Sequence, residues 1–272
     1  MQRYPTVLTI AGSDSGGGAG IQSDLKTIAA LGAYGASAIT ALTAQNTQGV
    51  RAIHAVPPEF LKQQLEAVFE DMTIDAVKIG MVNQIEVAQV ISEILDRFQP
   101  GFVVFDPVMV STSGAKLIQD ETIEVLWNTL FSRADLITPN LDEAQILIGR
   151  EIESVEEMKK AAEEMVEKGC KAVLLKGGHL IGAVLYDVFA RKNEPTLIME
   201  TAYIESENVH GTGCTLSSAI ATFISLGNAL PEAILFAKKY VAEAIDAGKN
   251  IRTGAGPGPL NHSFSPQKMH IR

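Results

Sequence analysis

Short apolar runs alternate with helix-patterned segments along most of the chain, and this alternation limits the possible folds most strongly. Residues 7–11 form an apolar run, after which apolar side chains at Ile21, Leu25, Ile28 and Leu31 repeat with helical spacing. Strands separated by helices in this way form a mostly parallel sheet that is covered on both faces. We therefore expect a three-layer α/β/α sandwich.

The same alternation continues to the end of the chain. Asn83 and Glu86 are placed to cap a predicted helix, and Ser154 with Glu157 has the pattern of a capping box. Further strands are expected at residues 37–43, 76–79, 102–105, 136–138 and 170–176, and further helices at residues 59–69, 85–98, 122–130, 141–148, 154–168, 215–225 and 232–247.

One edge of the sheet is expected to differ from the rest. Residues 184–190 and 196–202 are separated by a polar turn, which is typical of a small antiparallel extension. No linker, internal repeat or low-complexity segment divides the sequence. Since 46% of the 272 residues are hydrophobic, the chain can bury one large core. We expect a single domain over residues 1–272.

Charge and cysteine content narrow the possible partners. The 22 basic and 32 acidic residues give a net charge of -10 without basic clusters, which argues against a nucleic-acid partner. Cys170 and Cys214 make no disulfide framework, and no apolar stretch reaches the roughly 18 residues of a membrane span. The expected protein is cytoplasmic, with no membrane partner.

Two glycine-rich loops, residues 12–20 and 210–214, each precede a predicted helix. Such loops can present backbone N–H groups to an anion at the positive end of the helix dipole, although each loop could also be only a tight turn. Neither loop fits the dinucleotide or the P-loop fingerprint. The loops therefore favour an enzyme that handles phosphate groups without a dinucleotide-binding or P-loop motif.

Three charged residues follow or end predicted strands, where open α/β sheets place functional groups. Asp106 and Glu143 could organise Mg²⁺ directly or through water, or could instead serve as helix caps. Lys176 could neutralise phosphoryl oxygens, or could be an ordinary solvated charge.

Cys214 lies in the first turn predicted after the second glycine loop. The dipole of a helix lowers the pKa of a thiol at this position and makes it more reactive. Alternatively, Cys214 is an unreactive residue that packs as a small hydrophobic side chain.

Together these segments resemble the phosphomethylpyrimidine kinase family, the hydroxymethylpyrimidine and phosphomethylpyrimidine kinases of thiamine biosynthesis in the ribokinase-like superfamily. The similar stretches are residues 8–22, 39–47, 78–81, 106–109, 136–144, 175–179 and 210–217. The resemblance implies a ribokinase-like fold, ATP and Mg²⁺ as cofactors, a small-molecule substrate and a homodimer.

The resemblance also implies roles for single residues. The loop with Gly211 and Gly213 would form an anion hole for the transferred phosphoryl group, and Cys214 stands where sugar kinases carry an aspartate base. Lys176, Asp106 and Glu143 would serve ATP phosphates and Mg²⁺. The residues implied to bind the pyrimidine are Gln45, whose amide both donates and accepts, and Asp24, Met81, Val108 and Ala19.

Two alternatives remain open. A pyridoxal kinase would also phosphorylate a hydroxymethyl group on a flat nitrogen heterocycle. A catalytically silent pyrimidine or nucleotide sensor would be expected to lack the glycines of the anion hole or the pair Asp106 and Lys176, and all are present. One departure from the family is Ala255, which stands between two glycines where many relatives have histidine.

Overall fold

The apolar runs of the sequence become the strands of one sheet. In the computed structural model, which describes residues 2–82, 84–109, 120–178 and 184–272, nine strands follow the order β3-β2-β1-β4-β5-β6-β7-β8-β9. Their bounds are β1 (Thr6–Asp14), β2 (Tyr34–Asn46), β3 (Gly49–Ala55), β4 (Ala76–Ile79), β5 (Val103–Phe105), β6 (Leu136–Ile137), β7 (Ala172–Lys176), β8 (Val184–Arg191) and β9 (Leu197–Ala202).

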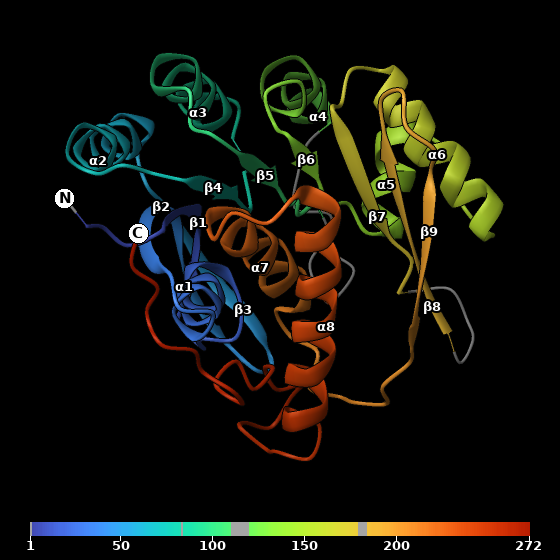
Figure 1. Ribbon diagram of the computed structural model, residues 1–272. Helices are drawn as coiled ribbons and strands as arrows, with labels where there is room; N and C mark the ends of the chain where they lie inside the picture. The colour runs from blue at the N-terminus through green and yellow to red at the C-terminus, as the bar shows by residue number, and fades with distance from the viewer. Residues whose placement is uncertain (1, 83, 110–119, 179–183) are drawn as a thin grey trace.

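Helices cover both faces of this sheet. They are α1 (Gly20–Ala30), α2 (Pro58–Asp71), α3 (Ile85–Phe98), α4 (Asp120–Leu126), α5 (Leu141–Ile148), α6 (Val155–Glu167), α7 (Thr212–Ser225) and α8 (Leu230–Gly248), and a π-helical turn at Trp127–Phe131 extends α4. Helices α2 to α6 pack on one face, and α1, α7 and α8 pack on the other (Figure 1). The expected three-layer sandwich is confirmed. Within the described ranges every helix is too short or too polar to cross a bilayer.

The strand directions match the expected mixture of a parallel centre and an antiparallel edge. Strands β2, β1, β4, β5, β6 and β7 are mutually parallel. Strands β8 and β9 extend the sheet in antiparallel fashion beyond β7, as the sequence predicts. The carboxyl ends of the parallel strands therefore meet at one edge of the sheet, which is where the candidate functional residues gather.

The core divides into one apolar layer on each side of the sheet. Leu8, Ile79 and Phe105 belong to the layer beneath α2 to α6, whereas Val7 and Val104 face the opposite layer with α1, α7 and α8. Neighbouring residues of one strand thus bury side chains on opposite faces, as a sheet covered on both sides requires. This double burial explains why the central strands read as continuous apolar runs.

The sequence prediction missed one strand and shortened another. Strand β2 begins three residues before and ends three residues after the predicted range 37–43, and it pairs with β3 in an antiparallel hairpin. Every residue of β3 except Ala55 is exposed, so no apolar face marks it in the sequence. The hairpin follows from backbone pairing, which the hydrophobic pattern does not report.

Two helix starts test the predicted caps. The Ser154 side chain accepts a hydrogen bond from the Glu157 N–H, which confirms Ser154 as the cap of α6. Helix α3 begins after Gln84, whose side chain makes no capping bond, and Asn83 lies outside the described residues. A capping box joins Asn140 and Glu143 at the start of α5, which confirms the helix-cap alternative for Glu143.

Candidate active site

Lys176 and Asp106 form an ion pair at the carboxyl edge of the sheet. Because β5 and β7 flank β6 in parallel, their ends lie close together, and Lys176 Nζ is 2.9 Å from Asp106 Oδ1. The Thr138 hydroxyl donates to the same oxygen. Burial disfavours the ionised form of Asp106, but the charges of Lys176 and Lys78 and the hydrogen bonds from Lys176 and Thr138 together outweigh it and keep the pKa of Asp106 below its usual value.

The start of α7 faces this pair. Gly211 is the N-cap residue and has a φ of 86°, a left-handed conformation that glycine adopts without strain. A Cβ at Gly213 would lie 3.2 Å from Lys176 Nζ and 3.3 Å from Asp106 Oδ2, so the backbone approaches the ion pair closely. The N–H groups of Gly213 and Cys214 have no partner among the described residues. This helix start therefore has the free donors that an anion requires.

The thiol of Cys214 does not have the expected low pKa. Burial raises the pKa of Cys214 to about 11, although the nearby Lys78 charge opposes the shift. The prediction that this thiol has a lowered pKa is therefore wrong, because burial outweighs the positive charge of Lys78. Cys214 remains partly accessible, whereas Cys170 is buried and has a pKa raised to about 12.

The first glycine loop is used differently from the second. The Asp14 carboxylate accepts hydrogen bonds from the N–H groups of Gly16, Gly18 and Ala19. These donors are therefore occupied, so of the two alternatives given for the glycine loops this loop follows the tight turn. Gly18 instead lies against the second loop, because a Cβ there would come within 2.4 Å of His210 Cδ2.

Gln45 meets the same histidine from the β2–β3 hairpin. Its side-chain nitrogen is 3.3 Å from His210 Nε2, and its side-chain oxygen accepts from Thr43. His210 Nε2 also lies 3.1 Å from Asp14 Oδ2. The structure thus brings Gln45, predicted to bind the pyrimidine, to the edge of the loop that begins α7. Sequence reasoning missed His210 as a link between the two glycine loops.

Asp24 is placed beneath the site. Its carboxylate is fully buried and accepts hydrogen bonds from Thr9, Ser218 and Lys78. Ser218 lies one helical turn after Cys214, so this ion pair underlies the start of α7. With these bonds made, Asp24 would act on a bound pyrimidine through its neighbours, and direct contact stays a prediction.

The other predicted pyrimidine residues border the same region. Met81 is partly exposed after β4 and would contact a Cβ at Gly12 at 3.2 Å. Val108 is partly exposed two residues after Asp106. Ala19 is the N-cap residue of α1, next to Gly211 of the second loop.

Glu143 combines a structural and a candidate metal role. One carboxylate oxygen accepts from the Asn140 N–H in the capping box, and the other accepts weakly from the Met109 N–H. Burial raises the pKa of Glu143 to about 7, and the Asp106 charge adds to this effect while Lys176 opposes it. Among the described residues no cluster of three or more metal-ligating side chains occurs.

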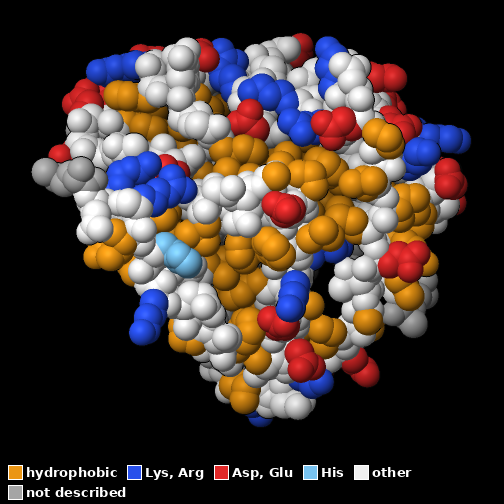
Figure 2. All heavy atoms as spheres, in the orientation of Figure 1, with side chains coloured by type: hydrophobic (Ala, Val, Ile, Leu, Met, Phe, Trp, Pro, Cys, Tyr) orange, Lys and Arg blue, Asp and Glu red, His pale blue; other side chains and the backbone are white. Residues whose placement is uncertain are grey.

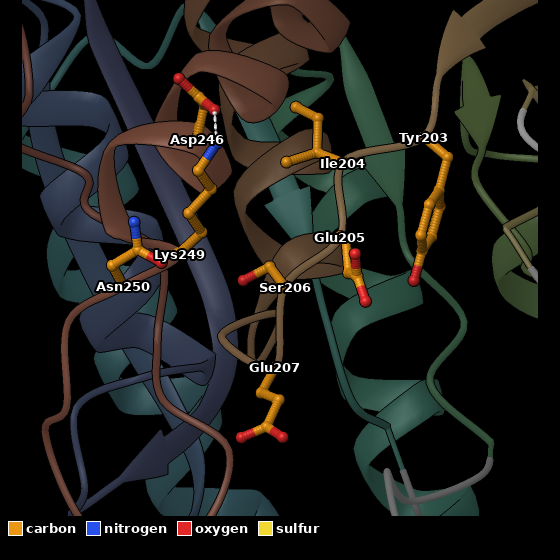
Figure 3. A pocket seen from close by; sticks show the side chains of 8 residues that line it. All are labelled: Tyr203, Ile204, Glu205, Ser206, Glu207, Asp246, Lys249 and Asn250. Atoms are coloured by element: carbon orange, nitrogen blue, oxygen red, sulfur yellow. Dashed lines mark hydrogen bonds and ion pairs between the residues drawn. The ribbon is translucent and has the colours of Figure 1, made fainter.

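A separate pocket of about 860 Å³ lies away from these residues, between the β9–α7 connection and the end of α8. Figure 2 shows this side of the molecule hollowed beside α8, and Figure 3 shows Glu205, Glu207 and Asp246 around the pocket. Lys249, its one lysine, already pairs with Asp246 at 2.7 Å. Excess negative charge makes this pocket unsuitable for phosphate groups.

A mostly parallel sheet with an antiparallel edge, and a site where a glycine-opened helix meets a lysine and an aspartate, define a ribokinase-like α/β fold. Residues 14–261 match the phosphomethylpyrimidine kinase family. The chain therefore belongs to this family.

Individual relatives agree with the family match. A hydroxymethylpyrimidine/phosphomethylpyrimidine kinase of Rhizobium meliloti is 49% identical over 94% of this chain and 96% of its own length. The crystal structure of phosphomethylpyrimidine kinase from Clostridium difficile is 46% identical and covers 88% of this chain and 99% of its own, with a TM-score of 0.78. Bacillus subtilis pyridoxal kinase in an ADP complex is 32% identical and covers 96% of this chain and 98% of its own, with a TM-score of 0.89.

Some relatives are longer proteins. The chain spans 54% and 48% of two bifunctional thiamine biosynthesis proteins, from Geobacter sulfurreducens and from rice. The similarity to these proteins therefore concerns about half of each.

Proposed function

We propose that the chain transfers the γ-phosphoryl group of ATP to the hydroxymethyl oxygen of 4-amino-5-hydroxymethyl-2-methylpyrimidine, and then a second phosphoryl group to the monophosphate. The observation that carries this proposal is the N–H pair of Gly213 and Cys214 beside Lys176, which has no partner in the described ranges of the chain. Relatives at 49% and 42% identity that are named for both kinase steps support the choice of substrate.

The proposed mechanism relies on position and charge. The acceptor oxygen attacks the γ-phosphorus in line while the bond to the β-phosphate oxygen breaks, and ADP leaves. The N–H groups at the start of α7 and the Lys176 ammonium stabilise the negative charge of the transferring group. In the first step, the acceptor proton passes to solvent, because the Cys214 thiol, with a pKa of about 11, is already protonated at neutral pH. In the second step the acceptor is already an anionic phosphate, so Cys214 orients it without acting as a base.

Mg²⁺ is part of this proposal. Asp106 and Glu143 are buried carboxyl groups whose charges repel each other, and this hard-oxygen environment fits a divalent cation. Since the described part of the chain supplies two such residues here, they would hold the ion together with water and phosphate oxygens. A bound Mg²⁺ would supply positive charge that neutralises the phosphates.

Pyridoxal is the second candidate acceptor. The observation in its favour is the similarity to a pyridoxal kinase structure at 32% identity, which is lower than the 49% identity to a kinase named for the pyrimidine. We therefore rank the pyrimidine first. A homodimer, which the family resemblance implies, and a cytoplasmic location, which the two unpaired cysteines favour, complete the proposal.

An ADP-release assay tests the proposal. It compares hydroxymethylpyrimidine, its monophosphate, pyridoxal and a sugar, with Mg²⁺ present or chelated, and mass spectrometry identifies the products. We expect both pyrimidines to be turned over and chelation to stop turnover. Turnover of pyridoxal alone would overturn the substrate assignment, and no turnover with any acceptor would favour the sensor.

A further inference from the structure

The glycine-rich segment near the C-terminus lies against two elements of the candidate site. We call residues 249–272 the C-terminal tail and Gly254, Gly256 and Gly258 the tail glycines. Figure 1 shows the tail in red, running from the end of α8 past the β2–β3 hairpin toward α1. We propose that Thr47 and the tail glycines are positioning residues, which hold the hairpin that carries Gln45 in register with the start of α7.

The first contact is at the turn of the hairpin. The Gly256 N–H donates to Thr47 Oγ1 at 3.1 Å. A Cβ at Gly256 would lie 2.0 Å from the Thr47 carbonyl oxygen, and a Cβ at Gly254 would lie 2.2 Å from Thr47 Oγ1. Neither glycine has a left-handed φ. Glycine is therefore required here by close contact with Thr47, and not by backbone conformation.

The second contact is with the loop that leads into α7. The Gly258 N–H donates to Asn208 Oδ1 at 2.9 Å, and a Cβ at Gly258 would lie 2.4 Å from that oxygen. The Gly258 carbonyl accepts from the His210 N–H. Asn208 is buried, and its side-chain nitrogen donates to the carbonyl of Gly248 at the end of α8. One short segment is thus fixed to α8 and to the residue before Gly211.

The hairpin needs an external support because it buries little of its own surface. Strand β3 is exposed along nearly all its length, with Val50 and Ile53 each 48% exposed. Segments with few buried apolar contacts open most easily. Gln45 is two residues from Thr47, so a shift of the turn moves the side chain that is predicted to bind the pyrimidine. The tail glycines therefore couple acceptor binding to the loop that forms the anion hole.

This inference rests on the proposed function for its kinetic test but not for its structural test. Thr47→Val removes the oxygen that Gly256 uses and keeps the side-chain shape, whereas Thr47→Ser keeps the oxygen. Gly256→Ala introduces the clash directly. Matched controls are Thr196→Val, at a partly buried threonine remote from the site, and Gly101→Ala, where a Cβ would meet only ordinary contact at 3.5 Å.

We expect Thr47→Val to raise the KM for hydroxymethylpyrimidine about fivefold, as the loss of one hydrogen bond allows, with kcat and the KM for ATP within about twofold of wild type. Gly256→Ala should act in the same direction and more strongly. Thr47→Ser and both controls should match wild type. Equal changes in both KM values, or no rescue by Thr47→Ser, would overturn the positioning role.

Amide hydrogen exchange over residues 42–50 provides a readout that needs no substrate. We expect faster exchange in Thr47→Val and Gly256→Ala than in wild type and the controls, with unchanged exchange in β4 and β5. If wild type turns over no pyrimidine but the exchange changes as expected, the proposed function fails and the positioning role of the tail stands. Unchanged exchange in the hairpin would refute the positioning role even in an active kinase.

Discussion

Lys78 Nζ lies 2.9 Å from both carboxylate oxygens of Asp24, and neither side chain is exposed to solvent. The pair joins β4 to α1 beneath the first turn of α7. Burial disfavours the charge on Lys78, but Asp24, with further contributions from Cys214 and Asp106, outweighs burial and raises the pKa of Lys78 above its usual value. Each charge therefore depends on the other to remain buried.

Removing one partner of this pair should destabilise the protein strongly. We expect Lys78→Met to lower the free energy of unfolding by about 3–5 kcal/mol, since it leaves the Asp24 charge buried without its partner. The double variant Lys78→Met, Asp24→Asn should lose less than the sum of the two single losses. Urea denaturation of all four proteins measures this coupling. Additive losses would show that the two charges do not depend on each other.

Lys78 also shows what the sequence could and could not predict. The strand Ala76–Ile79 is predicted correctly from its apolar residues, but this pattern assigns no burial and no partner to the single lysine within it. The sequence does not identify that partner, because Asp24 lies on a helix 54 residues earlier. Long-range pairs of this kind depend on packing that local patterns do not encode.

Some parts of the candidate site could be predicted from the sequence and others could not, because local patterns do not encode long-range packing. The order of strands and helices places Asp106 and Lys176 at one edge, so their proximity could be inferred from topology. The hydrogen bonds from the N–H groups of the first glycine loop to Asp14 could not be inferred from topology, because they depend on the direction of a side chain within a turn. Strand β3 was missed since both of its faces are exposed.

Lys176 and Gln45 should affect different steps of the proposed reaction. Lys176→Ala removes positive charge beside the transferring phosphoryl group, so kcat should fall at least a hundredfold with a small change in pyrimidine KM. Gln45→Ala should instead weaken pyrimidine binding roughly tenfold, as expected when a hydrogen-bonding partner worth about 1–3 kcal/mol is lost. Steady-state kinetics with each substrate varied in turn separates the two effects.

The control for Lys176 is Lys171→Ala, which removes a lysine whose side chain is 53% exposed near the opposite end of β7. It should leave kcat and the pyrimidine KM within about twofold of wild type, since exposed ion pairs contribute little to stability. If Lys176→Ala and Gln45→Ala change kcat and the pyrimidine KM alike, the assignment of Lys176 to phosphoryl transfer and of Gln45 to pyrimidine binding is wrong.

A side chain at Gly213 should block the site. Because a Cβ there would lie 3.2 Å from Lys176 Nζ, Gly213→Val should abolish measurable turnover while the protein stays folded. Circular dichroism and thermal unfolding check the fold, and the ADP-release assay checks activity. Gly101→Val, at an exposed position away from the site, is the matched control. Turnover near the wild-type rate in Gly213→Val would exclude close approach of this backbone to the phosphoryl group.

Glu143 should make stability depend on pH when no divalent cation is present. Its pKa is about 7 in the folded protein, against about 4.3 in an unfolded chain. As pH rises above 4.3 the unfolded chain loses this proton first, so the stabilisation from neutral Glu143 is present at low pH and is lost by pH 7. Stability of wild type relative to Glu143→Gln should therefore fall between pH 4.5 and 7.5, as measured by urea denaturation. A constant difference between the two proteins would contradict the raised pKa.

Cys214 should react slowly with iodoacetamide at neutral pH and faster as pH approaches its pKa of about 11. It should still react before Cys170, which is buried and has a pKa of about 12. Bound hydroxymethylpyrimidine should protect Cys214, since the thiol lies in the first turn of α7. Peptide mapping by mass spectrometry after alkylation, with and without pyrimidine, measures both rates.

The role of the thiol in turnover can be separated from its reactivity. If Cys214 only orients the acceptor, Cys214→Ser should keep at least a tenth of the wild-type kcat, because phosphoryl transfer through a loose transition state needs little help from a base. An orienting role should give similar losses in both phosphorylations, whereas a loss much larger in the first would indicate that the thiol acts as a base, because in the second the acceptor is already an anion. Preferential labelling of Cys170, or no protection of Cys214 by the pyrimidine, would remove this thiol from the acceptor site.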